Sequence, residues 1–376
     1  MTGQKGFQQR SSTAVAASTA GMHRHGLALA AALLALPSAP AFSAELKLPP
    51  TSVTAALRSS FVSTNVDGPG DDINDFVLDS VRLQIGGTVT DNIKFTFNTD
   101  YNSVTSEVLV IDAIGQFEFT PQFNIWAGRF LPPSDRANLH GPFYGNAWGF
   151  AIDGIQDGYP FYAAGRDNGV AYWGDFDRLK ISAGVFDVPS TAAAQGGDGE
   201  ELVYAARVHV SLWDIEKGYY LNGTYYGDKD ILSFGAATHS IDGDTSFTID
   251  GLMEKKLPNG GVVSVEGEWA SYEGKSGGYM PGSADPFDSS DGGFGLLAYL
   301  FPQPVGIGKI QLLGKYATNS YDAVGGDIDR DQLELDVNYV IKAFNARLSL
   351  FYIDNSFDGG TAADYSQIGV GMQLQI

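Results

Sequence analysis

The chain of 376 residues has no cysteine, few basic residues and few long apolar runs. Without cysteine there are no disulfides, no thiolate metal sites and no covalent haem attachment. Its 23 basic and 44 acidic residues give a net charge of −21. Binding of nucleic acid needs a surface rich in lysine and arginine that neutralises phosphates, so no nucleic-acid partner is expected. Beyond residue 44, no run of 18 consecutive apolar residues occurs, which excludes spanning helices.

Glycine and aromatic residues are abundant instead. The sequence holds 47 glycines, 23 phenylalanines and 18 tyrosines, and only 18% of its residues are charged. This composition favours many short strands joined by turns. A hydrophobic content of 44% is too high for a disordered chain.

The first 44 residues carry no acid and have the layout of a signal peptide. The basic stretch 22–25 precedes an apolar run at 26–36 and a small-residue stretch at 37–44. We therefore predict a signal peptide over residues 1–44, with Met22 as an alternative start and cleavage after Ser43 or Ala44. The mature domain, 45–376, then has a net charge of −24 and is exported through the periplasm.

Strand-length segments with a period of two recur along the mature chain. In residues 92–101, 202–213 and 332–341, apolar side chains alternate with polar ones. About 16 such segments can be marked, many near the 9–11 residues of a tilted membrane strand. Spanning helices are excluded, and a closed β-barrel is the other structure that can span lipid. We therefore predict an all-β fold, a transmembrane antiparallel β-barrel of about 16 strands in the bacterial outer membrane.

The connections between these segments differ in length. Acidic, glycine-rich stretches at 195–201, 274–293 and 319–331 are predicted outer loops, and tight links at 90–92, 120–121 and 342–343 are predicted periplasmic turns. The final segment, 365–376, is predicted to close the barrel. Acidic loops at 67–75 and 285–291 are candidates to bind divalent cations that bridge to lipopolysaccharide, against the alternative of solvated loops.

Residues 130–168 are too long for a turn and too aromatic for a solvated loop. Such a loop needs a wall to bury against, and the barrel lumen or a neighbouring subunit supplies one. We predict that it folds inward as a constriction, with a subunit-contact loop as the alternative. Its polar members are Asp135, Arg136, Asn138, His140, Asp153 and Asp157.

Side chains that line the lumen set the selectivity of a channel. Both signs of charge occur on the predicted inward faces, which favours weak selectivity. In the alternative interpretation, these charges pair across neighbouring strands and only stabilise the wall. The predicted pore-lining residues are Arg82, Lys94, Asp112, Glu118, Arg129, Asp135, Arg136, His140, Asp153, Arg207, Glu266, Glu268, Lys315, Glu334, Asp336 and Arg347.

Two stretches carry a resemblance to a known family. Ser80-Val81-Arg82-Leu83-Gln84-Ile85-Gly86-Gly87, followed by Asn92-Ile93-Lys94-Phe95, and Ile125-Trp126-Ala127-Gly128-Arg129-Phe130-Leu131-Pro132-Pro133 resemble a hairpin and a strand exit of the phosphate-selective porin O and P family. The resemblance implies a 16-stranded, homotrimeric diffusion channel with an inward-folded loop. Phosphate selectivity is not carried over, because the basic residues form no dense cluster.

These observations predict a porin, a channel for passive diffusion of small hydrophilic solutes or ions, with lipid and lipopolysaccharide around it. No enzyme, metal or cofactor is expected, because the histidines of the mature chain, His140, His209 and His239, are widely spaced. One alternative is a barrel sheath or scaffold of an electron-transfer cytochrome complex, which a wide lumen without a folded-in loop would favour. Another is a soluble secreted lectin.

Overall fold

The computed structural model describes residues 50–68, 72–102, 106–150, 165–187, 202–273, 287–323 and 326–376. All structural statements refer to these residues, which belong to the unit Pro49–Ile376. The predicted signal peptide, the predicted loop at 195–201, Asp153 and Asp157 lie outside them.

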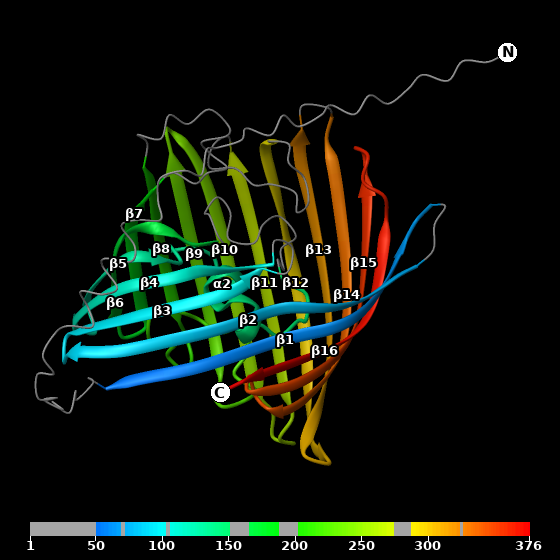
Figure 1. Ribbon diagram of the computed structural model, residues 1–376, viewed down its shortest axis with the longest axis horizontal. Coiled ribbons are helices and arrows are strands. Elements are labelled where there is room, and N and C mark those ends of the chain that lie inside the picture. The colour runs from blue at the N-terminus through cyan, green and yellow to red at the C-terminus, as the bar shows by residue number, and fades with distance from the viewer. Residues whose placement is uncertain are drawn as a thin grey trace, which may run out of the picture. The chain divides into compact units, whose positions relative to one another are not determined.

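Sixteen antiparallel strands form a closed barrel in which each strand pairs with its neighbours in sequence and β1 pairs with β16 (Figure 1). The predicted fold class is therefore confirmed. The strands are β1 (Thr51–Val66), β2 (Ile73–Thr90), β3 (Ile93–Asn102), β4 (Glu107–Thr120), β5 (Phe123–Phe130), β6 (Asp167–Phe176), β7 (Leu179–Phe186), β8 (Val203–Ser211), β9 (Ile231–Ile241), β10 (Asp244–Lys256), β11 (Val262–Glu273), β12 (Phe287–Val305), β13 (Gly308–Ala323), β14 (Ile328–Lys342), β15 (Ala346–Asp358) and β16 (Tyr365–Gln375).

Alternating side chains give the barrel an apolar outer face and a polar inner face. On β14, Leu335 is 49% exposed, whereas its neighbours Glu334 and Asp336 are buried inside. Because successive side chains of a strand point to opposite faces, this pattern shows which face of β14 points inward. Among the described residues, no helix is both long and apolar enough to cross a membrane.

Most connections at one end of the barrel, here called the turn end, are short. The tight links predicted at 90–92, 120–121 and 342–343 lie there. The exception is the connection between β8 and β9, residues 212–230. At the other end, two predicted loops are shorter than expected, because β12 already begins at Phe287 and β13 continues to Ala323. Backbone pairing does not require apolar side chains, so residues 289–293 and 318–322 pair as strands despite their polar composition.

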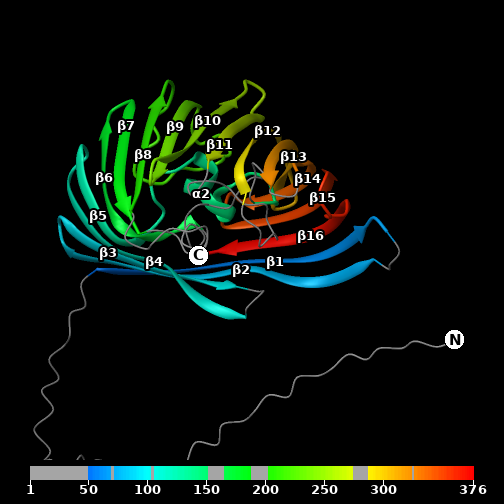
Figure 2. The same cartoon turned by 90° about the horizontal axis from the view of Figure 1, so that it is seen from above.

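The chain that follows β5 turns into the barrel, and Figure 2 shows α2 (Arg136–Tyr144) inside the ring of strands. Asp135 caps α2 by accepting a hydrogen bond from the backbone N–H of Asn138 at 2.6 Å. A kink follows at Gly141, where φ is +59°, and Pro142 comes next. We call residues 131–150 the inward loop. Its position confirms the predicted inward fold.

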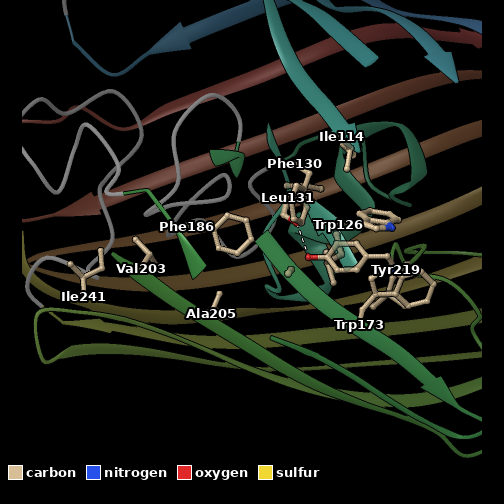
Figure 3. Close-up of a cluster of buried hydrophobic side chains, with 13 residues drawn as sticks. Ile114, Trp126, Phe130, Leu131, Trp173, Phe186, Val203, Ala205, Tyr219 and Ile241 are labelled. Carbon is tan, nitrogen blue, oxygen red and sulfur yellow. Dashed lines mark hydrogen bonds between the residues drawn. The ribbon is translucent and has the colours of Figure 1, made fainter. Parts of the chain in front are cut away.

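An apolar core fills the interior beside β5, β6 and β7 (Figure 3). Trp126, Phe130 and Trp173 from the wall pack there with residues of the inward loop and of the long turn-end connection. The hydroxyl of Tyr219, from that connection, donates to the carbonyl of Leu131 at 2.7 Å. This part of the barrel therefore encloses a packed core rather than water.

Candidate functional site

The inward loop is fixed to strands on one side of the barrel through its backbone carbonyls. Arg58 of β1 donates to the carbonyl of Trp148 at 2.6 Å, Arg347 of β15 donates to that of Asn146 at 2.9 Å, and Gln373 of β16 donates to that of Phe143 at 2.9 Å. All three wall side chains are buried. Basic and amide groups therefore satisfy carbonyls that would otherwise be buried without partners.

Acidic residues of the wall receive backbone N–H groups of the same loop. Asp336 accepts from Trp148 at 2.9 Å and Glu334 accepts from Gly149 at 2.6 Å. The ammonium of Lys315 lies 2.7 Å from the carboxylate of Glu334, and neither side chain is exposed. Four predicted pore-lining residues, Lys315, Glu334, Asp336 and Arg347, thus support the inward loop.

Arg136, the first residue of α2, is completely buried in a network of polar groups. Its guanidinium makes two hydrogen bonds to the carboxylate of Glu216, at 3.0 and 2.7 Å, and donates to the carbonyl of Asn222 at 2.7 Å. Asp250 lies 3.7 Å away and also accepts two hydrogen bonds from Arg207, at 2.5 and 2.8 Å. Because isolated charges are strongly destabilised in such an interior, the network holds these segments together.

The charges of Arg136 and Glu216 follow from their surroundings. Burial alone raises the pKa of Glu216, but the charge of Arg136 and hydrogen bonds from His209 and Arg136 outweigh it and hold that pKa well below the ordinary value. Burial likewise lowers the pKa of Arg136, and the charge of Glu216 outweighs this effect and raises it. Both groups are therefore charged at neutral pH.

Apart from Arg129, the remaining predicted pore-lining residues in the described part of the chain fall into two groups. Several are in close contact with an acidic or basic side chain: Arg82 with Asp100 at 2.8 Å, Lys94 with Glu118 at 2.7 Å, Asp112 with Arg166 at 3.3 Å, and His140 with Glu266 at 3.3 Å. Others contact the inward loop or belong to it: Arg207 donates to the carbonyl of Ser134, Glu268 accepts from the N–H of Ala137, and Asp135 caps α2. These residues thus meet one another or the inward loop inside the barrel.

Arg129 lies differently. Its register partners are Ala113 and Asn168, both exposed on the outward face, and directly paired residues of a sheet share a face. Its guanidinium lies 3.9 Å from the carboxylate of Asp167. The inward position predicted for it failed because Trp126 and Phe130 of the same strand point into the apolar core, so polarity does not mark the inner face of β5.

Sequence reasoning missed Glu216 and the segment that carries it, residues 212–230. No strand period marks this segment. It does contain Tyr219-Tyr220 and Tyr225-Tyr226, and the argument applied to residues 130–168 applies here too: the segment is too long for a turn and too aromatic for a solvated loop. Asp250 was also missed, although it lies on the polar face of β10.

A cavity of about 590 Å³ lies beside the inward loop. Its wall is formed by β1, β2, β3 and β14–β16, and by Pro142, Trp148 and Phe150 from the loop. The charged residues that line it are Arg58, Asp75, Asp79, Arg82, Asp100, Arg166 and Arg330. Both signs of charge therefore face this space. In the described part of the chain, no group of three or more His, Cys, Asp or Glu side chains is placed to hold a metal ion.

No protein-family model and no curated protein matches this chain. Among solved structures it resembles OmpF of Salmonella typhi in complex with daunomycin, with a TM-score of 0.56 over 87% of this chain and 97% of that one. The outer membrane channel DcaP of Acinetobacter baumannii gives 0.54 with coverages of 87% and 97%, and an anion-selective porin from Comamonas acidovorans gives 0.52 with 87% and 99%. Sequence identity is 12% in each case, so the likeness shows that the chain has the fold of outer-membrane porins.

The buried pair Arg136–Glu216 is expected to dominate the stability of the interior. Glu216→Ala leaves the Arg136 charge without its main partner and should lower the free energy of unfolding by about 3–5 kcal/mol. Urea unfolding in detergent micelles measures the change. The exposed pair Lys255–Asp230 is the matched control, and Lys255→Ala should cost about 0–1 kcal/mol. Equal losses in the two variants would contradict the assigned role.

Acid should weaken the same pair. Because the folded pKa of Glu216 lies below the ordinary value of 4.5, its stabilising contribution is present above pH 4.5 and is lost as the pH falls through the folded pKa. Urea unfolding measured between about pH 7 and pH 2 should therefore show a loss that is smaller in Glu216→Gln. Parallel pH profiles of the two proteins would show that Glu216 does not contribute.

Proposed function

We propose that this protein is an outer-membrane channel for passive diffusion of small hydrophilic solutes or ions. The observation that carries the proposal is a closed ring of sixteen strands, apolar outside and charged inside, whose interior is narrowed by a loop anchored to the wall. Such a ring satisfies every backbone group of its strands without water, which is the requirement for spanning lipid.

The outer face of the barrel supports a membrane location. Large apolar side chains are exposed on widely separated strands, among them Phe234 at 53%, Leu297 at 58% and Val370 at 55%. Exposed apolar surface on this scale needs a nonpolar environment. Together with the predicted signal peptide, this supports export through the periplasm into an outer membrane. Lipopolysaccharide contacts and a homotrimer stay predictions.

The interior supports weak rather than strong selectivity. The charged residues around the cavity are Arg58, Arg82, Arg166 and Arg330 together with Asp75, Asp79 and Asp100. Among these, Arg82 is paired with Asp100 at 2.8 Å, and Arg166 contacts Asp112 just beyond the cavity. Opposite charges at close range limit the preference for ions of either sign. Phosphate selectivity is not proposed.

The competing functions have less support. A sheath around a cytochrome needs a wide lumen, whereas the inward loop and residues 212–230 occupy this one. A hydrolase needs a histidine that contacts a nucleophile through one ring nitrogen and an acid through the other. Ser211 and Glu216 both contact the same nitrogen of His209, Nε2, at 3.4 and 3.2 Å, and Ser211 is 1% exposed. We therefore propose a channel without catalytic activity.

Recordings in planar lipid bilayers test the function. We expect discrete conductance steps and, in a tenfold salt gradient, a reversal potential well below the value of about 59 mV for perfect selectivity between monovalent ions. The reason is the mixed charge of the interior. A chain without conductance would contradict the channel, and a reversal potential near the limiting value would contradict weak selectivity.

The membrane location is tested on the outer face. Leu335→Arg places a charge near the middle of β14 and should lower the stability of the barrel in lipid vesicles by about 2–4 kcal/mol. Val305→Arg places the same charge at the turn end of β12, where water is close, and should cost about 0–1 kcal/mol. Denaturant unfolding in vesicles gives both values. If the two variants lost equal stability, the apolar outer face of the barrel would not be the lipid-facing surface.

A further inference from the structure

The long turn-end connection, residues 212–230, is unusual because its two ends lie side by side. The N–H of Leu212 donates to the carbonyl of Leu232 at 2.7 Å, and the N–H of Asp214 donates to that of Asp230 at 2.9 Å. The pairing of β8 with β9 thus continues to Asp214 and Asp230, where a two-residue hairpin turn would suffice to join the strands. The intervening residues 215–229 are therefore not needed to connect them.

These extra residues enter the barrel and are anchored there. The carboxylate of Glu254, buried on β10, accepts hydrogen bonds from the hydroxyl of Thr224 at 2.7 Å and from the N–H groups of Tyr225 and Gly227 at 3.0 and 2.8 Å. The N–H of Gly223 donates to the carbonyl of Tyr144 in the inward loop at 2.9 Å. The segment is thus held by the wall on one side and by the inward loop on the other.

The segment also reaches across the barrel. The ring of Tyr220 lies 5.7 Å from that of Trp126 on β5, and the ring of Tyr226 lies 5.2 Å from that of Phe344 in the turn after β14. Residues 212–230 therefore extend from the β5 wall to the β14–β15 turn. They cover the interior faces of the strands between these points.

Interior side chains of the covered strands are more buried than several on the opposite wall. On the covered strands, Ser264 of β11 is 2% exposed and Thr248 of β10 is 1% exposed. On the opposite wall, Gln84 of β2 is exposed and Thr96 of β3 is partly exposed, although both occupy inward-facing positions of the register. Water can therefore reach parts of the interior faces of β2 and β3, whereas it does not reach Thr248 of β10 or Ser264 of β11.

We infer that residues 212–230 form a second constriction, which narrows the turn end of the barrel and confines solutes there to the side of β1–β4. The inference rests on the proposed channel function and specifies its path. Because the segment is tied to the inward loop by the Arg136–Glu216 pair and by Tyr219, the two constrictions form one barrier. The size limit for hydrophilic solutes is then set by the space between this barrier and β1–β4.

The absence of cysteine makes the path directly measurable in the full-length chain. Thr96→Cys places a thiol in the proposed path, whereas Ser264→Cys places one behind the segment. A water-soluble, charged methanethiosulfonate reagent added during bilayer recording should reduce the current of Thr96→Cys and leave that of Ser264→Cys unchanged. The cysteine-free chain, treated in the same way, controls for effects of the reagent itself.

A second variant removes the barrier. Residues 215–229 are replaced by Asn-Gly, which the neighbouring ends at Asp214 and Asp230 can accept as a hairpin turn. Folding is checked by the heat-modifiable shift of the barrel on gels. We expect the single-channel conductance to rise about twofold or more and Ser264→Cys to become reactive in this background, because the covered sector is opened to water.

Two results would overturn the inference: equally fast reaction of Ser264→Cys and Thr96→Cys in the full-length chain, or unchanged conductance of the folded deletion variant. If the deletion variant does not fold, the thiol reactivities in the full-length chain decide. Failure of the proposed function looks different, since the unaltered chain would then show no conductance, and the inference would fall with it.

Discussion

The packing of the barrel interior depends on the buried charge of the Arg136 guanidinium. A buried positive charge must be matched by negative or carbonyl partners, and here the partners come from separate parts of the chain: Glu216 and Asn222 from the turn-end segment, Ser233 from β9 and Asp250 from β10. If one of these partners moved away, the buried charge of Arg136 would lose part of its compensation. The inward loop, the turn-end segment and the wall are therefore fixed together by one requirement for charge pairing.

The barrel could be predicted from the sequence, because alternation of apolar and polar residues is a local property. On β14, residues from Gln332 to Asn338 alternate between a polar interior and an apolar outer face, so the pattern identifies the strand and its faces. On β5 this logic fails. Trp126 and Phe130 face an interior core made by segments remote in sequence, and both faces of the strand are apolar. The inward position predicted for Arg129 failed for this reason, and Glu216 was missed because it lies in a segment with no period at all.

Most of the charges predicted to line a pore hold the inward loop in place or pair with a neighbour. Glu334 and Arg347 form hydrogen bonds with the backbone of the inward loop, and Lys315 lies against Glu334. Polarity of an inward face therefore shows which way a side chain points but not whether it meets water. That second property depends on what crosses the lumen, and the crossing segments are irregular pieces whose paths are determined by contacts far apart in the chain.

The hydrogen bonds of the inward loop also bear on how the cylinder is sealed. Arg58 of the first strand and Gln373 of the last are directly paired in the sheet, and they donate to the carbonyls of two adjacent loop residues, Pro142 and Phe143. The loop thus bridges the seam where the first and last strands of the barrel meet. Bringing remote strands together costs chain entropy, which a docked loop reduces by presenting neighbouring acceptors to both. Sealing of the cylinder and docking of the loop are consequently coupled, since each places the partners of the other.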